Sequence, residues 1–190
     1  MLMSISKLCA ARLFSDIADE QQYILCIYGI ELWLYTIIST IGLFLTGFLF
    51  RATWEAAVII AVFYACQSNG GGFHADTHMK CFLTMSIGLA AGLLMIRFLA
   101  SGCFIPVTGL IGIVLLLVFP LCLHENKQYL KINEYIFKRR SVICTLLIAA
   151  VTALLYLLNH NLFLAGCAGL FLSAISRTAA ALLANQRRNI

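Results

Sequence analysis

The sequence predicts an all-α integral membrane protein with about six transmembrane helices and an amphipathic helix at the N-terminus that lies in the membrane interface. The first observation behind this prediction is composition, because 62% of the 190 residues are hydrophobic and only 11% are charged. A soluble domain of this composition would expose large apolar patches. The second is the succession of apolar stretches, most of them near the roughly 20 residues that a membrane-spanning helix needs. We expect a single membrane-embedded domain over residues 1–190.

The N-terminal segment, residues 1–22, differs from the rest because apolar and polar residues alternate at helical spacing. The polar residues Ser4, Lys7, Asp16 and Asp19 fall outside an apolar stripe formed by Leu2, Ile5, Cys9, Leu13 and Ile17. This pattern predicts a helix over residues 2–20 that lies in the interface rather than across the bilayer.

Six apolar stretches follow, separated by short polar breaks. They cover residues 23–50, 53–67, 81–100, 103–123, 141–159 and 162–184. The first is long enough to cross the bilayer with a tilt, whereas the second is short for a span.

Most lysines and arginines fall on one side of this arrangement, which predicts its orientation. With the N-terminus in the cytoplasm, only Arg51 and Arg97 lie near the outer face. The positive-inside rule therefore predicts cytoplasmic N- and C-termini and a basic cytoplasmic loop over residues 124–140. Two further charges, Glu31 and Arg177, are embedded at a similar depth of about 10 Å, so they are candidates for an ion pair, and the alternative is that each extends separately toward the interface.

One polar, glycine-broken segment stands out, because it carries several chemically active groups between two apolar stretches. Residues 68–80 contain Gly70-Gly71-Gly72 and then His74, Asp76 and His78, and Cys81 follows directly. Three glycines permit a folded-back backbone, so we expect a catalytic re-entrant loop at the cytoplasmic face.

Cys81 is the expected nucleophile of this segment. It is placed at the head of the third span, where the helix dipole and Lys80 favour the thiolate. His78 would share a helix face with it, whereas His74, seven residues earlier, is about 10.5 Å away on a straight helix. Local geometry therefore favours His78 as the base, and the glycines keep His74 in contention.

Two other interpretations of the segment remain open. His74, Asp76, His78 and Cys81 could form a tetrahedral metal site in a non-enzymatic binding or transport bundle, although no HExxH motif is present. The histidines and the cysteine could also be structural. The remaining cysteines lie in or beside apolar stretches and are expected to be small buried hydrophobes: Cys9, Cys26, Cys66, Cys103, Cys122, Cys144 and Cys167.

The spacing of these residues resembles the signature of the accessory gene regulator B family (AgrB). The match consists of Gly71-Gly72-Phe73-His74-Ala75 with Cys81 seven residues after the histidine, together with a later Pro120 and Asn126-Lys127 element. Members are membrane cysteine endopeptidases that process a quorum-sensing propeptide. The resemblance implies that His74 is the catalytic histidine and Cys81 the catalytic cysteine, with no metal and no cofactor.

The resemblance also implies the reaction and the partners. A short amphipathic propeptide loses its C-terminal tail through a Cys81 thioester and is cyclised to a thiolactone or lactone. We therefore expect this chain to form a homodimer in the bacterial cell membrane, as the resemblance suggests, and to bind no nucleic acid. Gly88 and Gly92 are spaced as in helix–helix contacts of membrane proteins, which is compatible with a dimer.

Supporting roles are expected for residues around the two catalytic groups. Asp76, Gly71 and Gly72 are expected to orient or support the loop. In the family an arginine often stands where this chain has Gln67, which is therefore a candidate for substrate binding. The basic residues that would hold an acidic propeptide tail, or else only contact anionic lipid, are Lys127, Lys131, Lys138, Arg139 and Arg140.

Overall fold

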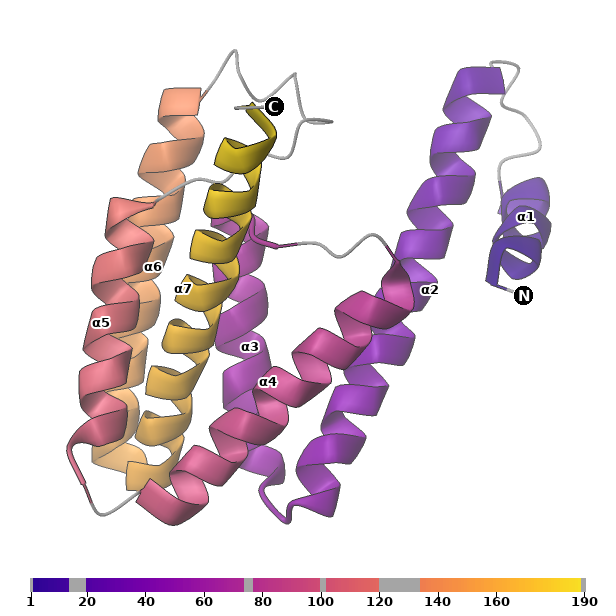
Figure 1. Cartoon of the computed structure of the whole chain (residues 1–190). Helices are drawn as coiled ribbons and strands as arrows, with labels where there is room; N and C mark the ends of the chain where they lie inside the picture. The colour runs from indigo at the N-terminus through magenta and orange to yellow at the C-terminus, as the bar shows by residue number, and fades with distance from the viewer. Residues whose placement is uncertain (1, 14–19, 74–76, 100–101, 120–133, 189–190) are drawn as a thin grey trace. The chain divides into compact units, whose positions relative to one another are not determined.

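The computed structural model describes residues 2–13, 20–73, 77–99, 102–119 and 134–188. Within these ranges all regular secondary structure is α-helical, which confirms the predicted all-α class. The helices are α1 (Leu2–Leu13), α2 (Glu20–Leu49), α3 (Thr53–Gly70), α4 (His78–Leu99), α5 (Phe104–Val118), α6 (Glu134–Leu158) and α7 (His160–Arg188) (Figure 1).

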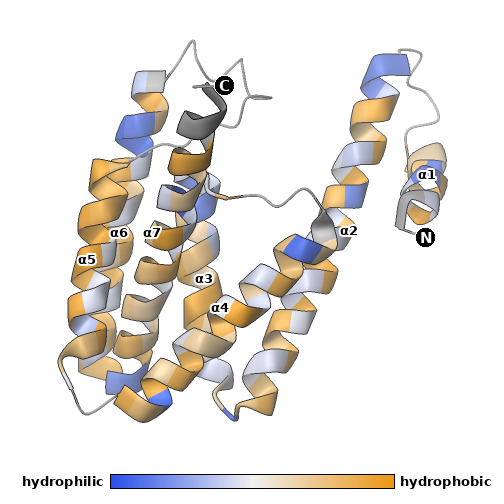
Figure 2. Ribbon diagram, viewed as in Figure 1, coloured by the Kyte–Doolittle hydropathy of each residue, from blue (hydrophilic) through white to orange (hydrophobic). Residues whose placement is uncertain are grey.

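Four of these helices, α2, α4, α6 and α7, are long and apolar enough to cross a membrane, and α5 is a shorter apolar helix. The chain is therefore an all-α membrane protein, whereas the count of six spans stays a prediction. In Figure 2 the helices are orange along most of their length, and hydrophilic residues gather where α6 begins.

Several helices have bounds other than those predicted. α3 continues to Gly70 and α4 begins at His78, so only residues 71–77 of the expected 68–80 loop lie between helices. α6 begins at Glu134, inside the predicted basic loop of residues 124–140, and α1 is described only to Leu13. Hydropathy marks where the apolar segment ends, whereas backbone hydrogen bonding can continue into polar residues.

The chain divides into two compact units, Met1–Leu45 and Thr46–Ile190. In the first unit, α1 exposes Ile5, Leu8 and Leu13, and it buries Ser6 and Ala10. An interfacial helix would place such exposed apolar side chains in lipid.

In the second unit α7 is the central helix, packed against α3, α4, α5 and α6 (Figure 1). The buried core joins three helices through Val62, Cys66, Leu116, Leu170 and Ala174. The approach of α5 to α7 is close, because a Cβ added at Gly112 would lie 2.9 Å from backbone atoms of Phe171. Small residues at such positions let membrane helices pack backbone to backbone.

α4 also packs against this bundle, through two glycines near the middle of α4. A Cβ at Gly88 would lie 3.6 Å from Leu172, and one at Gly92 would lie 3.4 Å from Ile59 and 3.6 Å from Leu172. These two glycines therefore pack within the chain, and the predicted homodimer stays a prediction.

Candidate functional site

The segment between α3 and α4 begins with a turn that requires glycine. Gly71 has a φ of 72°, in the left-handed region, and directly follows the last residue of α3. Its N–H donates a 2.9 Å hydrogen bond to the carbonyl of Gln67. With a ψ of −175°, Gly71 ends the helix in a backbone conformation that is open almost only to glycine.

The two neighbouring glycines are required for a different reason, which is close contact. A Cβ at Gly70 would overlap the guanidinium of Arg177, and a Cβ at Gly72 would overlap the side-chain amide of Gln67. Each of the three consecutive glycines thus meets a separate steric demand. We call residues 70–73 the glycine hinge.

The glycine hinge is fastened to α7 at Ser176. The N–H of Phe73 donates to the carbonyl oxygen of Ser176 at 3.1 Å and to its Oγ at 3.2 Å. Nε2 of Gln67 donates to the same Oγ at 2.6 Å. One hydroxyl therefore receives a bond from the end of α3 and another from the residue that precedes His74, as its two lone pairs permit.

Arg177 is buried beside this anchor, with 1% of its surface exposed. Its guanidinium donates to the carbonyl of Cys66 at 2.7 Å, to Oγ of Ser141 at 3.2 Å and to the carbonyl of Phe119 at 3.4 Å. Two of these acceptors lie near the C-terminal ends of α3 and α5, where the helix dipole is negative.

Arg177 therefore joins four helices, α3, α5, α6 and α7, at one end of the bundle. The predicted partner of this residue, Glu31, belongs to the first unit, and that pair stays a prediction.

Cys81 lies in the first turn of α4, as the sequence predicted. Thr77 caps this helix: its Oγ1 accepts from the N–H of Lys80 at 3.3 Å, and its carbonyl accepts from the N–H of Cys81 at 3.1 Å. The thiol is half-buried. Because helical side chains lean toward the N-terminus, the sulfur of Cys81 lies over the turn where the first N–H groups point outward.

Several predicted site residues lie outside the described part of the chain. These are His74, Asp76, Lys127 and Lys131, and the side chain of His78 as well. The choice between the two histidines as base therefore stays a prediction.

The metal interpretation is not tested either. The described residues contain no group of three or more metal-binding side chains, but three of the four proposed ligands are not described. The described cysteines are all free. Cys66 and Cys167 are buried as predicted, whereas Cys103 is exposed.

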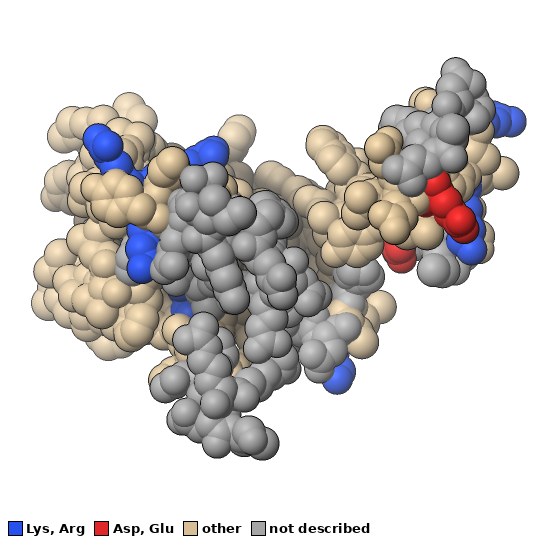
Figure 3. Space-filling model, turned by 90° about the horizontal axis from the view of Figure 1, so that it is seen from above, with Lys and Arg blue, Asp and Glu red and all other residues tan. Residues whose placement is uncertain are grey.

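A hollow of about 420 Å³ lies next to the glycine hinge, between the end of α3 and the start of α6. Its lining includes Asn69, Arg139, Arg140, Ile143 and Leu147. Both arginines are exposed, and Figure 3 shows basic groups at this end of the second unit. The hollow thus combines two cations with an apolar floor, within one residue of Gly70.

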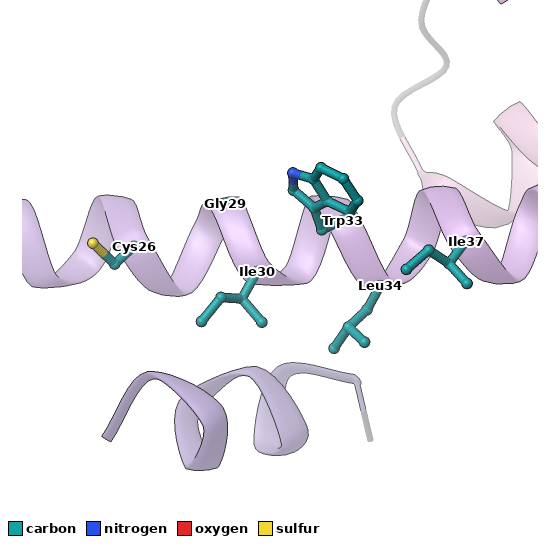
Figure 4. A pocket seen from close by; sticks show the side chains of 6 residues that line it. All are labelled: Cys26, Gly29, Ile30, Trp33, Leu34 and Ile37. Atoms are coloured by element: carbon teal, nitrogen blue, oxygen red, sulfur yellow. The ribbon is translucent and has the colours of Figure 1, made fainter. Parts of the chain in front are cut away.

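A second hollow, of about 350 Å³, lies on α2 (Figure 4). Cys26, Ile30, Trp33 and Leu34 are among its lining residues, which include no acid, base or hydroxyl. It offers an apolar surface to lipid and no arrangement for chemistry.

Sequence reasoning missed three residues of the site. Thr77 had a signal, because a threonine directly before a helix start is a preferred N-cap. Ser176 and Ser141 had none, since a lone serine in an apolar helix does not indicate what it contacts.

These features define an all-α membrane protein with a thiol at the start of a capped helix, directly after an anchored glycine hinge. The family model for Accessory gene regulator B matches residues 6–177. The chain therefore belongs to the AgrB family, as the sequence resemblance indicated, and is a membrane protein of accessory gene regulator quorum-sensing processing. Neither the curated proteins nor the solved structures include a match to the chain.

Proposed function

We propose that the chain is a membrane cysteine endopeptidase that removes the C-terminal tail of an autoinducer propeptide and promotes its cyclisation. The observation that carries this proposal is the placement of Cys81 in the first turn of a capped helix. That position sets a sulfur nucleophile beside the N–H groups of a helix start, which can stabilise the negative charge that develops in acyl transfer. Membership of the AgrB family supports the choice of a peptide substrate.

The first step is acyl transfer to the enzyme. His74 takes the proton of the Cys81 thiol, and the thiolate attacks the carbonyl carbon of the scissile peptide bond. The C–N bond breaks as the imidazolium of His74 protonates the departing amine. The tail leaves, and the rest of the propeptide is held as a thioester.

Backbone N–H groups at the start of α4 are suited to stabilise the oxyanion of this step. A helix leaves its first N–H groups without intrahelical acceptors. The N–H of Lys80 is occupied by Thr77, so His78 and Met79 supply the N–H groups that we assign to the oxyanion.

The second step is ring closure. A cysteine thiol or serine hydroxyl of the same propeptide attacks the thioester and gives its proton to His74. The bond to Cys81 breaks, the thiol is regenerated, and a thiolactone or lactone is released. Holding the internal nucleophile close and excluding water favours ring closure over hydrolysis.

The hollow beside the hinge supports a binding role for Arg139 and Arg140. An acidic propeptide tail there would pair with two guanidinium groups, one residue from the glycine hinge. Lys127, Lys131 and Asp76 are proposed supporting residues, as predicted from the sequence. The proposal includes cytoplasmic termini, a cytoplasmic active site and a homodimer.

The covalent chain keeps the two halves of the site close to each other. Phe73 is hydrogen-bonded to α7, and His78 begins α4. Five Cα–Cα steps separate these residues, so their Cα atoms are at most about 18 Å apart. His74 and Cys81 are thus attached to two fixed ends of one short segment.

The test uses the full-length chain in phosphatidylcholine–phosphatidylglycerol vesicles with a synthetic propeptide that has an amphipathic helix, a central cysteine and an acidic tail. We expect Cys81→Ser to abolish tail release, and mass spectrometry to detect an acyl adduct on Cys81 of the unmodified chain. His74→Ala should be inactive, whereas His78→Ala should retain substantial activity.

Two outcomes would contradict the proposal. Normal tail release by Cys81→Ser would exclude the thioester. Stoichiometric zinc in the purified chain, with loss of activity on chelation, would favour the metal-binding bundle instead.

A further inference from the structure

We infer that Ser176 and Arg177 of α7 are positioning residues that hold the glycine hinge in its active conformation. This inference rests on the proposed peptidase function. Neither residue lies within the segment that carries the catalytic groups, and the hydrogen bond from Phe73 to Ser176 joins residues 103 positions apart in the sequence.

Ser176 acts on the hinge through its hydroxyl. Oγ accepts from Nε2 of Gln67 at 2.6 Å and from the N–H of Phe73 at 3.2 Å. It therefore sets the distance between the last turn of α3 and the far end of the glycine hinge. Because a peptide bond joins Phe73 to His74, a change in this anchor moves the backbone to which the catalytic histidine is attached.

Arg177 acts on the other end of the hinge. Its guanidinium lies against Gly70, so closely that no Cβ fits between them, and it donates to the carbonyl of Cys66 in the last turn of α3. The same group donates to Ser141 and to the carbonyl of Phe119. The place where α3 ends is thus fixed relative to α5 and α6.

A buried arginine in a membrane bundle is expensive unless it is well bonded. This one is bonded to three other helices next to the glycine hinge: near the C-terminal ends of α3 and α5, and at Ser141 within α6. Support for the fold alone would not require the adjacent residue, Ser176, to receive two bonds from the segment that leads to His74. The combination points to placement of the reacting groups.

The test compares Ser176→Ala with a matched control in the same helix. Thr178→Val also removes a hydroxyl, but Oγ1 of Thr178 donates only to carbonyls of its own helix among the contacts that the structure describes, those of Ala174 and Ile175. We expect Ser176→Ala to lower kcat about tenfold, the equivalent of one lost hydrogen bond, with KM nearly unchanged. Thr178→Val should leave both near the unmodified values, and Ser176→Thr should restore most of kcat.

A second measurement does not depend on catalysis. Hydrogen exchange, followed by mass spectrometry on peptides covering residues 70–73, reports whether the Phe73 amide is held. We expect faster exchange in Ser176→Ala and in Arg177→Lys, since an ammonium cannot bond three acceptors in the arginine geometry. Thr178→Val should exchange as the unmodified chain does.

The outcomes separate this inference from the proposed function. Unmodified kcat or unmodified exchange in Ser176→Ala would overturn the positioning role while leaving the peptidase intact. If Cys81→Ser released the tail normally, the peptidase proposal would fail, and the positioning role in this reaction would fail with it. The exchange data would then report on the hinge alone.

Discussion

Nε2 of Gln67 lies 2.6 Å from Oγ of Ser176, although 109 residues separate them in the chain. The other end of the same amide is different, because Oε1 of Gln67 is buried and has no hydrogen-bond partner among the described residues. A buried acceptor without a partner costs about 1–3 kcal/mol. Gln67 therefore contributes one useful bond to the hinge and one unfavourable group to the interior.

This asymmetry predicts that stability and activity respond to Gln67→Leu in different directions. The substitution removes a bond worth about 1 kcal/mol, but it also removes the unsatisfied acceptor. We expect the Tm in vesicles to stay the same or rise, while kcat falls about tenfold because the anchor at Ser176 is lost. Thermal unfolding and tail release, measured on the same preparation, check both.

The control for this prediction is Ser68→Ala, which removes a hydroxyl whose described hydrogen bonds, to Ala65 and from Asn69, stay within the same helix. It should change neither quantity. A double-mutant cycle of Gln67→Leu with Ser176→Ala should give a coupling energy of about 1 kcal/mol. Additive effects on kcat would show that the two side chains do not act together.

Substitutions at two of the hinge glycines, Gly71 and Gly72, are predicted to be harmful for separate reasons. Gly71→Ala places a side chain at φ 72° and ψ −175° and should cost about 1–3 kcal/mol of stability, and Gly71→Asn should cost about as much because this region is open almost only to glycine. Gly72→Ala should be harmful because of contact with Gln67. Gly29→Ala is the control, since nothing lies within 4 Å of a Cβ there; we expect it to be neutral or stabilising.

The steric account makes a prediction about rescue. Gln67→Ala removes the amide that a Cβ at residue 72 would overlap. We therefore expect the double variant Gly72→Ala/Gln67→Ala to be more stable than the sum of its single variants implies, by about 1 kcal/mol or more. No such rescue is expected for Gly71→Ala, whose strain arises from its own backbone. Thermal unfolding of Gly72→Ala, Gln67→Ala, the double variant and Gly71→Ala tests this prediction.

The helices and the position of the thiol could be predicted from the sequence, because both depend on local patterns. Apolar stretches located the helices, and the end of a polar segment placed Cys81 near a helix start. The contacts that fix the site could not be predicted, since they involve distant backbone groups. Arg177 was recognised as an embedded charge in need of partners, but its described acceptors include the carbonyls of Cys66 and Phe119, 111 and 58 residues away. Carbonyl groups occur at every residue and leave no sign in the sequence.

The cap of α4 predicts a local effect on the thiol. Thr77→Val removes the acceptor for the N–H of Lys80 and should destabilise the helix start by about 1 kcal/mol. We expect faster alkylation of Cys81 by iodoacetamide in a chain whose other cysteines are replaced by alanine, because a frayed first turn exposes the half-buried thiol. Thr77→Ser should react as the unmodified chain does.

The control, Thr84, lies about two turns after Thr77. Thr84 donates to the carbonyl of Lys80 within α4, at 2.8 Å. Thr84→Val therefore removes a hydroxyl without touching the cap, and the alkylation rate of Cys81 should not change. Equal acceleration by Thr77→Val and Thr84→Val would contradict a role for the cap.

The arginines that line the hollow at the start of α6 predict a preference for an acidic tail. Replacing both Arg139 and Arg140 by glutamine should raise KM about tenfold for a propeptide with an acidic tail, and leave kcat nearly unchanged, because the tail leaves before ring closure. The same variant should cleave a neutral-tailed propeptide as well as the unmodified chain does. Added salt should weaken the preference, since exposed charges are screened. Arg97→Gln, which removes an exposed cation at the end of α4, is the control for net charge. An equal rise in KM for both propeptides, with the amount of inserted protein unchanged, would mean that these arginines contact lipid rather than substrate.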